Sequence, residues 1–218
     1  MTVHRPLAAA VLAMAVLAGP AVHAAPVAIV NASFEADVFG DGGFNLTAPS
    51  GWTNIGGTSV GTFNPLVSQL VAPTDGVQVL YINGTGDVRQ TLADTVAVGT
   101  YTLSADFAFR KDCCGTGDFT MSLLAGGDTL ASVTGGLASG FSSTAFKTAE
   151  FSVDVVAGAA GIGAPLVIRF QTTAGQTDID NVQLDFAAAA PVPVPASAWL
   201  LLPALAGLGR LARRKAHA

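Results

Sequence analysis

The residues of this chain whose types could support chemistry are carboxylates rather than histidines. The three histidines, His4, His23 and His217, lie near the two ends, so the central region offers none for a Ser-His-Asp triad, a Cys-His pair or a His-ligated zinc site. Fifteen acidic residues lie between Glu35 and Asp185, and thirteen of them are aspartates. Aspartates on short loops suit Ca²⁺, although the same composition is typical of a soluble acidic surface. Paired carboxylates could also hydrolyse glycosides, but no such pair is recognisable, and the sequence predicts no catalytic residue.

The charge of the central region excludes one class of partner. This region carries five basic against fifteen acidic side chains, a net charge of −10. Such a surface repels phosphate backbones, so we expect no nucleic-acid partner. Half of all residues are hydrophobic, and glycine and proline together occupy 36 of 218 positions. This composition is too apolar for a disordered chain and unfavourable for a helix bundle, and the length fits one domain with short appendages.

Residues 1–24 have the pattern of a secretory signal peptide. A short positive start precedes an apolar run over residues 7–18, and small residues then flank a cleavage site after Ala24. The run is too short to span a membrane. We therefore expect a removable signal helix followed by a folded domain over residues 25–190.

The other end of the chain has three parts. These are a proline-rich spacer (191–195), an apolar stretch (196–209) and a basic end (210–218). As a helix the apolar stretch would be about 21 Å long, at about 1.5 Å per residue. The hydrocarbon core of a membrane is about 30 Å thick, so this short apolar helix would be a marginal span.

The order of these three parts resembles the PEP-CTERM sorting tail of Gram-negative bacteria. Pro193, Val194 and Pro195 occupy the motif, with Val194 in place of the usual glutamate. The resemblance implies transient insertion into the inner membrane, cleavage by an exosortase-type transpeptidase, and delivery to the outer surface or extracellular matrix. A plain membrane anchor is the alternative, while the basic end argues against a GPI signal.

Cys113 and Cys114 are the only cysteines, and they are adjacent. Export would bring them into an oxidising compartment. They could then form a vicinal disulfide or bridge two chains, or they could remain free thiols. A strained ring in this glycine-containing loop would mark a tip that faces a ligand; the alternative is a disulfide with no functional role.

The central region reads as an all-β fold. Short alternating runs with glycine-rich breaks predict about nine strands, at residues 27–30, 77–82, 88–92, 101–109, 119–125, 129–133, 146–156, 166–172 and 179–186. A turn is expected at 83–86. Tyr101, Leu103 and Phe107 share a face and should be core, whereas Asp106 has the opposite phase and should face solvent. This pattern predicts a two-sheet β-sandwich of jelly-roll type, with Trp52 in its core and Phe39, Phe44 and Phe63 in loops.

Four segments carry a second resemblance. They are residues 30–35 (VNASFE), 49–52 (PSGW), 99–105 (GTYTLSA) and 178–184 (DIDNVQL). In this order they resemble the galactose-binding-like jelly roll of carbohydrate-binding modules and bacterial surface domains. The resemblance implies a fold but no enzymatic activity.

That family often binds a Ca²⁺ between its first and last strands. The matching positions here are Glu35 and Asp180, with Asn31 and Asp178 as further candidate ligands. Asp178 and Asp180 are two residues apart and would share a strand face. The alternative is that these carboxylates bind loop amides or pair with an arginine.

The functional prediction from the sequence is an exported, non-catalytic protein of the cell surface or exopolysaccharide matrix. Its expected partners are the sorting transpeptidase and extracellular polysaccharide, with a role in adhesion or glycan binding. The alternative is a secreted carbohydrate-active enzyme, such as a carboxylate-based glycosidase, or its accessory module. A third possibility is a structural matrix protein without a specific ligand.

Overall fold

The structure, a computed structural model, describes residues 23–190. This part of the chain is built almost entirely of strands. They are β1 (Ala25–Pro26), β2 (Thr53–Phe63), β3 (Val79–Thr95), β4 (Gly99–Phe109), β5 (Phe119–Ala125), β6 (Asp128–Gly135), β7 (Lys147–Val155), β8 (Pro165–Thr172) and β9 (Gln176–Ala188), with a short 3-10 helix, η1 (Leu137–Ser139). The predicted all-β class is therefore confirmed. No helix among these residues is long and apolar enough to cross a membrane.

The predictions for the two ends of the chain fall outside the described residues. These predictions are the signal peptide up to residue 22, the spacer with its motif Pro193, Val194 and Pro195, the apolar stretch and the basic end. They remain predictions from the sequence.

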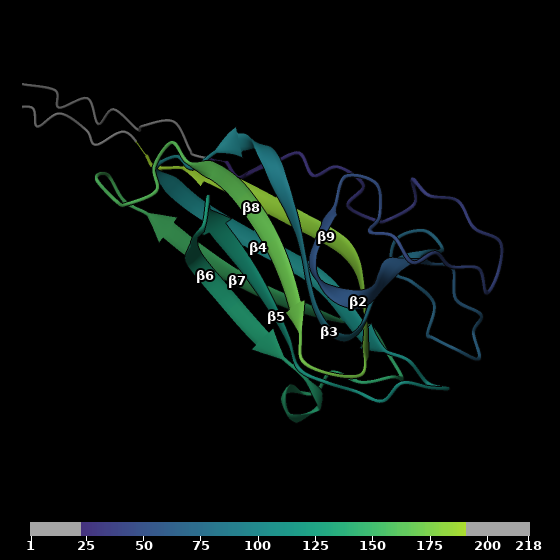
Figure 1. Cartoon of the computed structure of the whole chain (residues 1–218). Coiled ribbons are helices and arrows are strands. Elements are labelled where there is room, and N and C mark those ends of the chain that lie inside the picture. The colour runs from purple at the N-terminus through teal and green to yellow at the C-terminus, as the bar shows by residue number, and fades with distance from the viewer. Residues whose placement is uncertain (1–22, 191–218) are drawn as a thin grey trace, which may run out of the picture. The chain divides into compact units, whose positions relative to one another are not determined.

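Strand β3 joins the two layers of the domain. The strands follow the order β6-β5-β8-β3-β9-β4-β7, with β2 paired to β3 and β1 paired to β9. The first residues of β3 pair with β9, and its residues from Gly86 onward pair with β8. One layer therefore contains β6, β5 and β8, and the other contains β9, β4 and β7 (Figure 1). Strands β6 and β7 also contact each other, so the sheet nearly closes into the predicted jelly-roll sandwich.

The expected turn at residues 83–86 is wrong. Strand β3 runs through this segment, and β2 pairs with it on both sides. Gly84 has a φ of +81°, and a side chain at Gly86 would collide with Ile82. The glycines therefore bend one long strand between the two layers instead of reversing the chain. Strand β2 was not predicted, because its run of glycine and threonine shows no apolar alternation.

The main core fills the space between the two layers. Tyr101, Leu103 and Phe107 are buried in it as predicted, and Trp52 is 6% exposed. The ring of Phe107 stacks on that of Phe119, with 3.7 Å between the centroids. The alternation along β4 is therefore the sequence signal that identified this face correctly.

The outer face of β4 is covered at Asp106, which corrects the prediction for this residue. This residue is 6% exposed rather than solvent-facing. Its Oδ1 accepts a hydrogen bond from the hydroxyl of Thr148 at 2.5 Å, and its Oδ2 accepts one from the amide of Asn181 at 3.0 Å. Strand phase separates the two faces of a sheet, but it does not tell which face is exposed.

A second apolar cluster lies on the outer face of the β2, β3 and β4 strands. It consists of Phe63, Leu70, Val79, Tyr81 and Ala108. Loop segments 37–50 and 64–78 run over this face; these purple-to-blue loops gather on the right of Figure 1. Phe63 was expected in an accessible loop but ends β2 and is 2% exposed. The loops leave a pocket over this outer cluster.

Candidate functional site

The pocket has a volume of about 200 Å³ and opens on the outer face of the sheet. Its walls combine aromatic, polar and sulfur-containing side chains. They are Phe44, Ser59, Phe63, Tyr81, Asn83, Arg110, Cys113, Cys114 and Gln176. A mostly apolar hollow with a few polar groups is the usual form of a small-molecule site.

The aromatic wall of the pocket is held by packing around Tyr81. The rings of Phe44 and Phe63 each meet the Tyr81 ring edge-on, with 6.3 Å between centroids. The Tyr81 hydroxyl donates a hydrogen bond to the carbonyl of Asn45 at 2.5 Å. Burial raises the pKa of Tyr81 above its ordinary value, so this hydroxyl keeps its proton at neutral pH.

Asp178 lies beneath this wall and is fully buried. The register of β9 places it beside Tyr81 on β3 and Ala108 on β4, both members of the outer cluster. Burial raises the pKa of Asp178 to about 7, against a smaller lowering by a hydrogen bond from Gln176. At neutral pH a large fraction of this carboxyl group is therefore protonated.

The two oxygens of Asp178 have different surroundings. Oδ1 accepts a hydrogen bond from the amide Nε2 of Gln176 at 2.8 Å. Oδ2 is buried and finds no hydrogen-bond partner among residues 23–190. Because Oδ1 is already engaged as an acceptor, the proton is expected on Oδ2. A buried, unpartnered carboxyl oxygen beside a pocket marks Asp178 as a candidate functional group.

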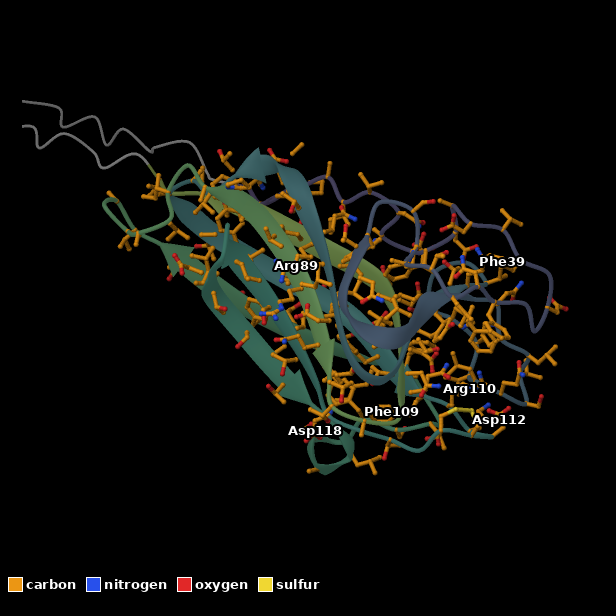
Figure 2. All side chains as sticks on the ribbon, viewed as in Figure 1. Phe39, Arg89, Phe109, Arg110, Asp112 and Asp118 are labelled. Carbon is orange, nitrogen blue, oxygen red and sulfur yellow. A yellow bond between two sulfur atoms is a disulfide. The ribbon has the colours of Figure 1, made fainter. Side chains whose placement is uncertain are left out.

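Arg110 brings a positive charge to the pocket, and Asp112 balances it. The guanidinium donates to the Asp112 carboxylate through Nε at 2.8 Å and Nη2 at 2.9 Å. The same guanidinium lies 4.6 Å from the centre of the Phe63 ring. Figure 2 shows Arg110 and Asp112 at the same end of the domain as the yellow disulfide sulfurs. The net electrostatic effect on the pocket is small, because the two charges largely cancel.

Cys113 and Cys114 form a vicinal disulfide in the structure, and both line the pocket. They lie in the loop between β4 and β5, and both are solvent-exposed. Asn83 on β3 approaches the sulfur of Cys114, with 4.0 Å between Nδ2 and Sγ. Among the alternatives open from the sequence, this structure contains the disulfide within one chain.

The four residues considered as calcium ligands do not all converge. Glu35 Oε1 accepts hydrogen bonds from the amides of Val77 and Gln78 at 2.8 and 2.6 Å. Asp180 Oδ2 accepts hydrogen bonds from the amides of Thr74 and Asp75 at 2.7 and 2.8 Å. Both carboxylates therefore hold one loop, residues 74–78, through its backbone amides. This is the amide-binding arrangement considered above as the alternative to metal binding.

Asn31 and Asp178 have other roles in this structure. Asn31 Oδ1 accepts a hydrogen bond from the amide of Ala36 at 3.0 Å, within the first loop. Asp178 shares a strand face with Asp180, as expected, but its carboxyl contacts Gln176 at the pocket. In the described part of the chain, no three His, Cys, Asp or Glu side chains form a group able to hold a metal ion. Calcium binding by Glu35 and Asp180 remains a prediction.

Of the nine residues that line the pocket, the sequence singled out four: Phe44 and Phe63 as loop aromatics, and Cys113 and Cys114 as a loop tip that could face a ligand. The other five were missed. Tyr81 belonged to an alternating strand and was not considered as a site residue, and Gln176 and Arg110 lie at strand ends with no recognisable motif. Asp178 was selected, but as a metal ligand. A signal was present: an aspartate within a strand is costly to bury, and buried carboxyl groups are often functional.

The sequence matches one family over most of its length. Residues 25–185 match the model of the HpiC1-like family, described as HpiC1 cyclase. No curated protein matches the sequence.

Several solved structures share the fold. A cyclase from Fischerella sp. TAU is 21% identical, with a TM-score of 0.67 over 78% of this chain and 100% of that one. The Stig cyclase Fisc from the same organism, in complex with (3Z)-3-(1-methyl-2-pyrrolidinylidene)-3H-indole, is 20% identical, with a TM-score of 0.65 over 77% of this chain and 100% of that one.

A more distant similarity involves a carbohydrate-binding protein. The CBM22 tandem domain of Paenibacillus barcinonensis Xyn10C is 16% identical, with a TM-score of 0.52 over 80% of this chain and 50% of that one. The predicted likeness of the body to carbohydrate-binding jelly rolls is therefore confirmed at the level of the fold. At this identity it says nothing about ligands.

The family match corrects the functional prediction. A non-catalytic surface protein that binds glycans was expected, because the sequence contains no recognisable catalytic group. That prediction is wrong, because the matching family is one of cyclases and its model covers the whole sandwich from β1 almost to the end of β9. The chain belongs to the HpiC1-like cyclase family.

Proposed function

We propose that the pocket is the active site of a cyclase in which Asp178 is the general acid. The observation that carries this proposal is the buried Asp178 carboxyl, whose pKa is raised to about 7 beside a pocket with aromatic walls. A general acid is most effective when its pKa lies near the working pH. Family membership supports ring closure as the class of reaction.

The proposed step conserves all atoms of the substrate. Asp178 transfers its proton from Oδ2 to an unsaturated carbon of the ligand and becomes a carboxylate. The resulting cation is attacked by an electron-rich ring of the same molecule, which forms a new carbon–carbon bond. That ring then releases a proton, which returns to Asp178, so the product is a cyclic isomer of the substrate.

The surroundings of Asp178 suit the intermediate of this step. Faces of aromatic rings attract cations, and Phe44, Phe63 and Tyr81 supply such rings in the pocket wall. The bound ligand itself must exclude water from the pocket, because water would otherwise capture the cation. Because Asp178 is 0% exposed, the ligand must reach its proton through the wall formed by Tyr81 and Gln176. A small shift of these two side chains on binding is part of the proposal.

An indole-bearing substrate is the class we propose for this pocket. One related cyclase structure contains 4-(1H-indol-3-yl)butan-2-one, and another contains the indole derivative named above. Indole is an electron-rich planar ring, which matches both the aromatic wall and the need for an internal nucleophile. Asn83 and Gln176 offer hydrogen-bonding groups at the pocket for the polar part of such a molecule.

The proposed activity is tested by incubating the domain (residues 23–190) with indoles that carry an unsaturated side chain. The domain contains the complete sheet and its core, and it forms one compact unit. We expect products of unchanged mass and new retention time in liquid chromatography–mass spectrometry. Asp128→Asn, which alters an exposed carboxylate on β6, is the matched control and should retain the activity. Failure to form any cyclic isomer across the panel would contradict the proposal.

We also propose that Glu35 and Asp180 can hold a structural Ca²⁺. These two carboxylates fit such a role because both approach residues 74–78, and Glu35 Oε2 accepts no hydrogen bond from the described residues. Asp178 does not fit, because its carboxyl is fully buried beneath the pocket wall and accepts a hydrogen bond from Gln176. In this proposal the ion fastens the 74–78 loop, which covers the outer cluster, and takes no part in ring closure.

The calcium proposal predicts a metal-dependent thermal stability. With Ca²⁺ at a hundredfold excess over its dissociation constant, the domain should gain about 2.7 kcal/mol over its EDTA-treated form. Glu35→Gln should remove this gain, whereas Asp178→Asn should keep it. Equal unfolding midpoints in EDTA and in Ca²⁺ would show that the two carboxylates only bind loop amides.

We further propose that the domain acts outside the cytoplasm, after export and sorting. The apolar run at 7–18 and the sorting-tail resemblance around Pro193, Val194 and Pro195 support this location. The disulfide in the pocket loop agrees with an oxidising compartment. The expected partners are an exosortase-type transpeptidase and, briefly, the inner membrane.

This location predicts two processing events. Mass spectrometry of the protein recovered from an exosortase-containing Gram-negative host should find a first residue at Ala25 and a new end near residues 191–195. In a host that lacks the transpeptidase, the second cleavage should be absent. A full-length chain recovered from the cytoplasm of the first host would contradict the proposal.

A further inference from the structure

We propose that the Cys113–Cys114 disulfide is a substrate-contacting wall of the pocket and sets the size of the ring system that fits. Both sulfur-bearing side chains line the pocket together with side chains of β2 and β3. The inference rests on the proposed function of the pocket and adds to it a determinant of substrate specificity. No catalytic group among those named above is part of this wall.

A disulfide between adjacent residues cannot stabilise the fold in the way that an ordinary disulfide does. A disulfide stabilises mainly by closing a chain loop in the unfolded state, and the effect grows with loop length. The bridge between Cys113 and Cys114 has a sequence separation of 1, so it closes almost no loop. Its effect on the conformational entropy of the unfolded chain is correspondingly small. Its contribution must lie in the local shape that it gives to the loop.

Contacts that do not involve the disulfide hold the base of this loop. The Lys111 ammonium group donates hydrogen bonds to the carbonyls of Val67 and Leu70, at 2.9 and 3.3 Å. On the other side, the backbone amide of Gln176 donates a hydrogen bond to the carbonyl of Gly115 at 3.3 Å. A side chain at Gly175 would lie 2.6 Å from that same carbonyl oxygen, so the two segments pack closely. The loop therefore remains attached to the domain on both sides of the cysteines.

The tip of the loop is the part that the disulfide shapes. Cys114 has a φ of +72° and Gly115 one of +71°, so the backbone turns sharply at the tip. Left-handed backbone is uncommon for a residue other than glycine. The cysteine side chains are exposed and have one polar contact in the described structure, from Asn83. This leaves the sulfur surface free to meet a ligand.

The chemistry of this wall matches a planar aromatic ring. Sulfur is polarizable and packs favourably against aromatic groups. A ligand ring inside the pocket would have the disulfide on one side and the Phe44 and Tyr81 side chains among its other neighbours. Removal of the bridge allows the two cysteine side chains to separate and widens the pocket at this side. The chemical class selected by the intact wall is a small indole-sized ring system.

The test compares the affinities of two probes for the oxidised domain and for a variant without the bridge. The probes are indole and the larger carbazole, and the variant is Cys113→Ala/Cys114→Ala. By calorimetry, the intact domain should bind indole more tightly than carbazole. The variant should lose tenfold or more in affinity for indole and much less for carbazole. Reduction of the wild type should have the same effect, and reoxidation should reverse it.

The selectivity ratio separates this role from a merely structural one. If the bridge only supported the fold, its removal would weaken the binding of both probes equally and would lower the unfolding midpoint of the domain. Equal losses, unchanged affinities, or no binding of either probe by the wild type would each overturn the inference. Turnover is measured separately. If the disulfide controls the selectivity between the two probes but no ring closure occurs, only the proposed activity is refuted. Ring closure that is indifferent to the disulfide refutes this inference alone.

Discussion

Asp178→Asn is expected to slow ring closure by about 10²–10⁴-fold, which is the range that a positioned general acid typically contributes. Asparagine keeps the shape of the protonated carboxyl and its hydrogen bond from Gln176, but it has no acidic proton. The affinity for the probe 4-(1H-indol-3-yl)butan-2-one should change by less than about threefold, because the substitution removes stabilisation of the transition state and not of the bound ligand. The measurement is the single-turnover rate of the variant beside its calorimetric affinity.

Asp128→Asn serves as the matched control for this variant. It makes the same chemical change on an exposed strand residue outside the pocket, and its rate should equal that of the wild type. If Asp178→Asn kept a rate within about threefold of the wild type, Asp178 would not be the acid. The proton donor would then have to be sought elsewhere in the pocket.

The same substitution should stabilise the domain at alkaline pH. In the folded state burial raises the pKa of Asp178 to about 7, whereas the ordinary value is 3.8. Between these two pH values the folded state binds a proton that the unfolded state does not. The contribution of Asp178 to the free energy of unfolding is therefore most favourable below about pH 4, and it is lost as the pH rises to 7. The loss over this window is at most about 4 kcal/mol, at about 1.4 kcal/mol per pH unit. Asparagine avoids this loss because it remains uncharged.

Chemical denaturation at two pH values checks this expectation. The free energies of unfolding of wild type and Asp178→Asn should be similar at pH 4, and the variant should be more stable at pH 8 by up to about 4 kcal/mol. Asp180, with a pKa raised to about 6, also destabilises the folded state as the pH rises, but equally in both proteins. Equal stabilities of the two proteins at pH 8 would contradict the claim that Asp178 is held protonated. A gain in stability on removal of an active-site group is a common trade-off.

The strands with regular alternation could be predicted from the sequence, and those with glycine-rich runs could not. Strand β5 was predicted with its correct bounds, and the face of β4 that bears Phe107 was identified, because apolar alternation reports burial directly. Strand β2 and the bend in β3 were missed, because glycine marks bends within strands as well as turns. The sequence could not distinguish these two uses of Gly84 and Gly86.

The site was harder to predict than the fold, because its residues come together only through strand pairing. Asp178, Tyr81 and Arg110 lie on three strands or their ends, and no local motif links them. The wrong non-catalytic prediction came from looking for histidines and carboxylate pairs. A single buried aspartate can act as an acid without either, once a covering loop removes it from water. Burial of the outer sheet face depends on segments 37–50 and 64–78, whose loop sequences gave no sign of where they pack.

The most direct test of the mechanism is an infrared titration of the Asp178 carboxyl between pH 5 and 9. The spectrum of Asp178→Asn is subtracted from that of the wild type at each pH, so that Asp180 and the exposed carboxylates cancel. The proposed mechanism predicts a protonated-carboxyl band that disappears with a midpoint near pH 7, in line with the pKa to which burial raises this group. A carboxylate that is already ionised at pH 5 and remains so to pH 9 would contradict the proposed role of Asp178 as the acid of this cyclase.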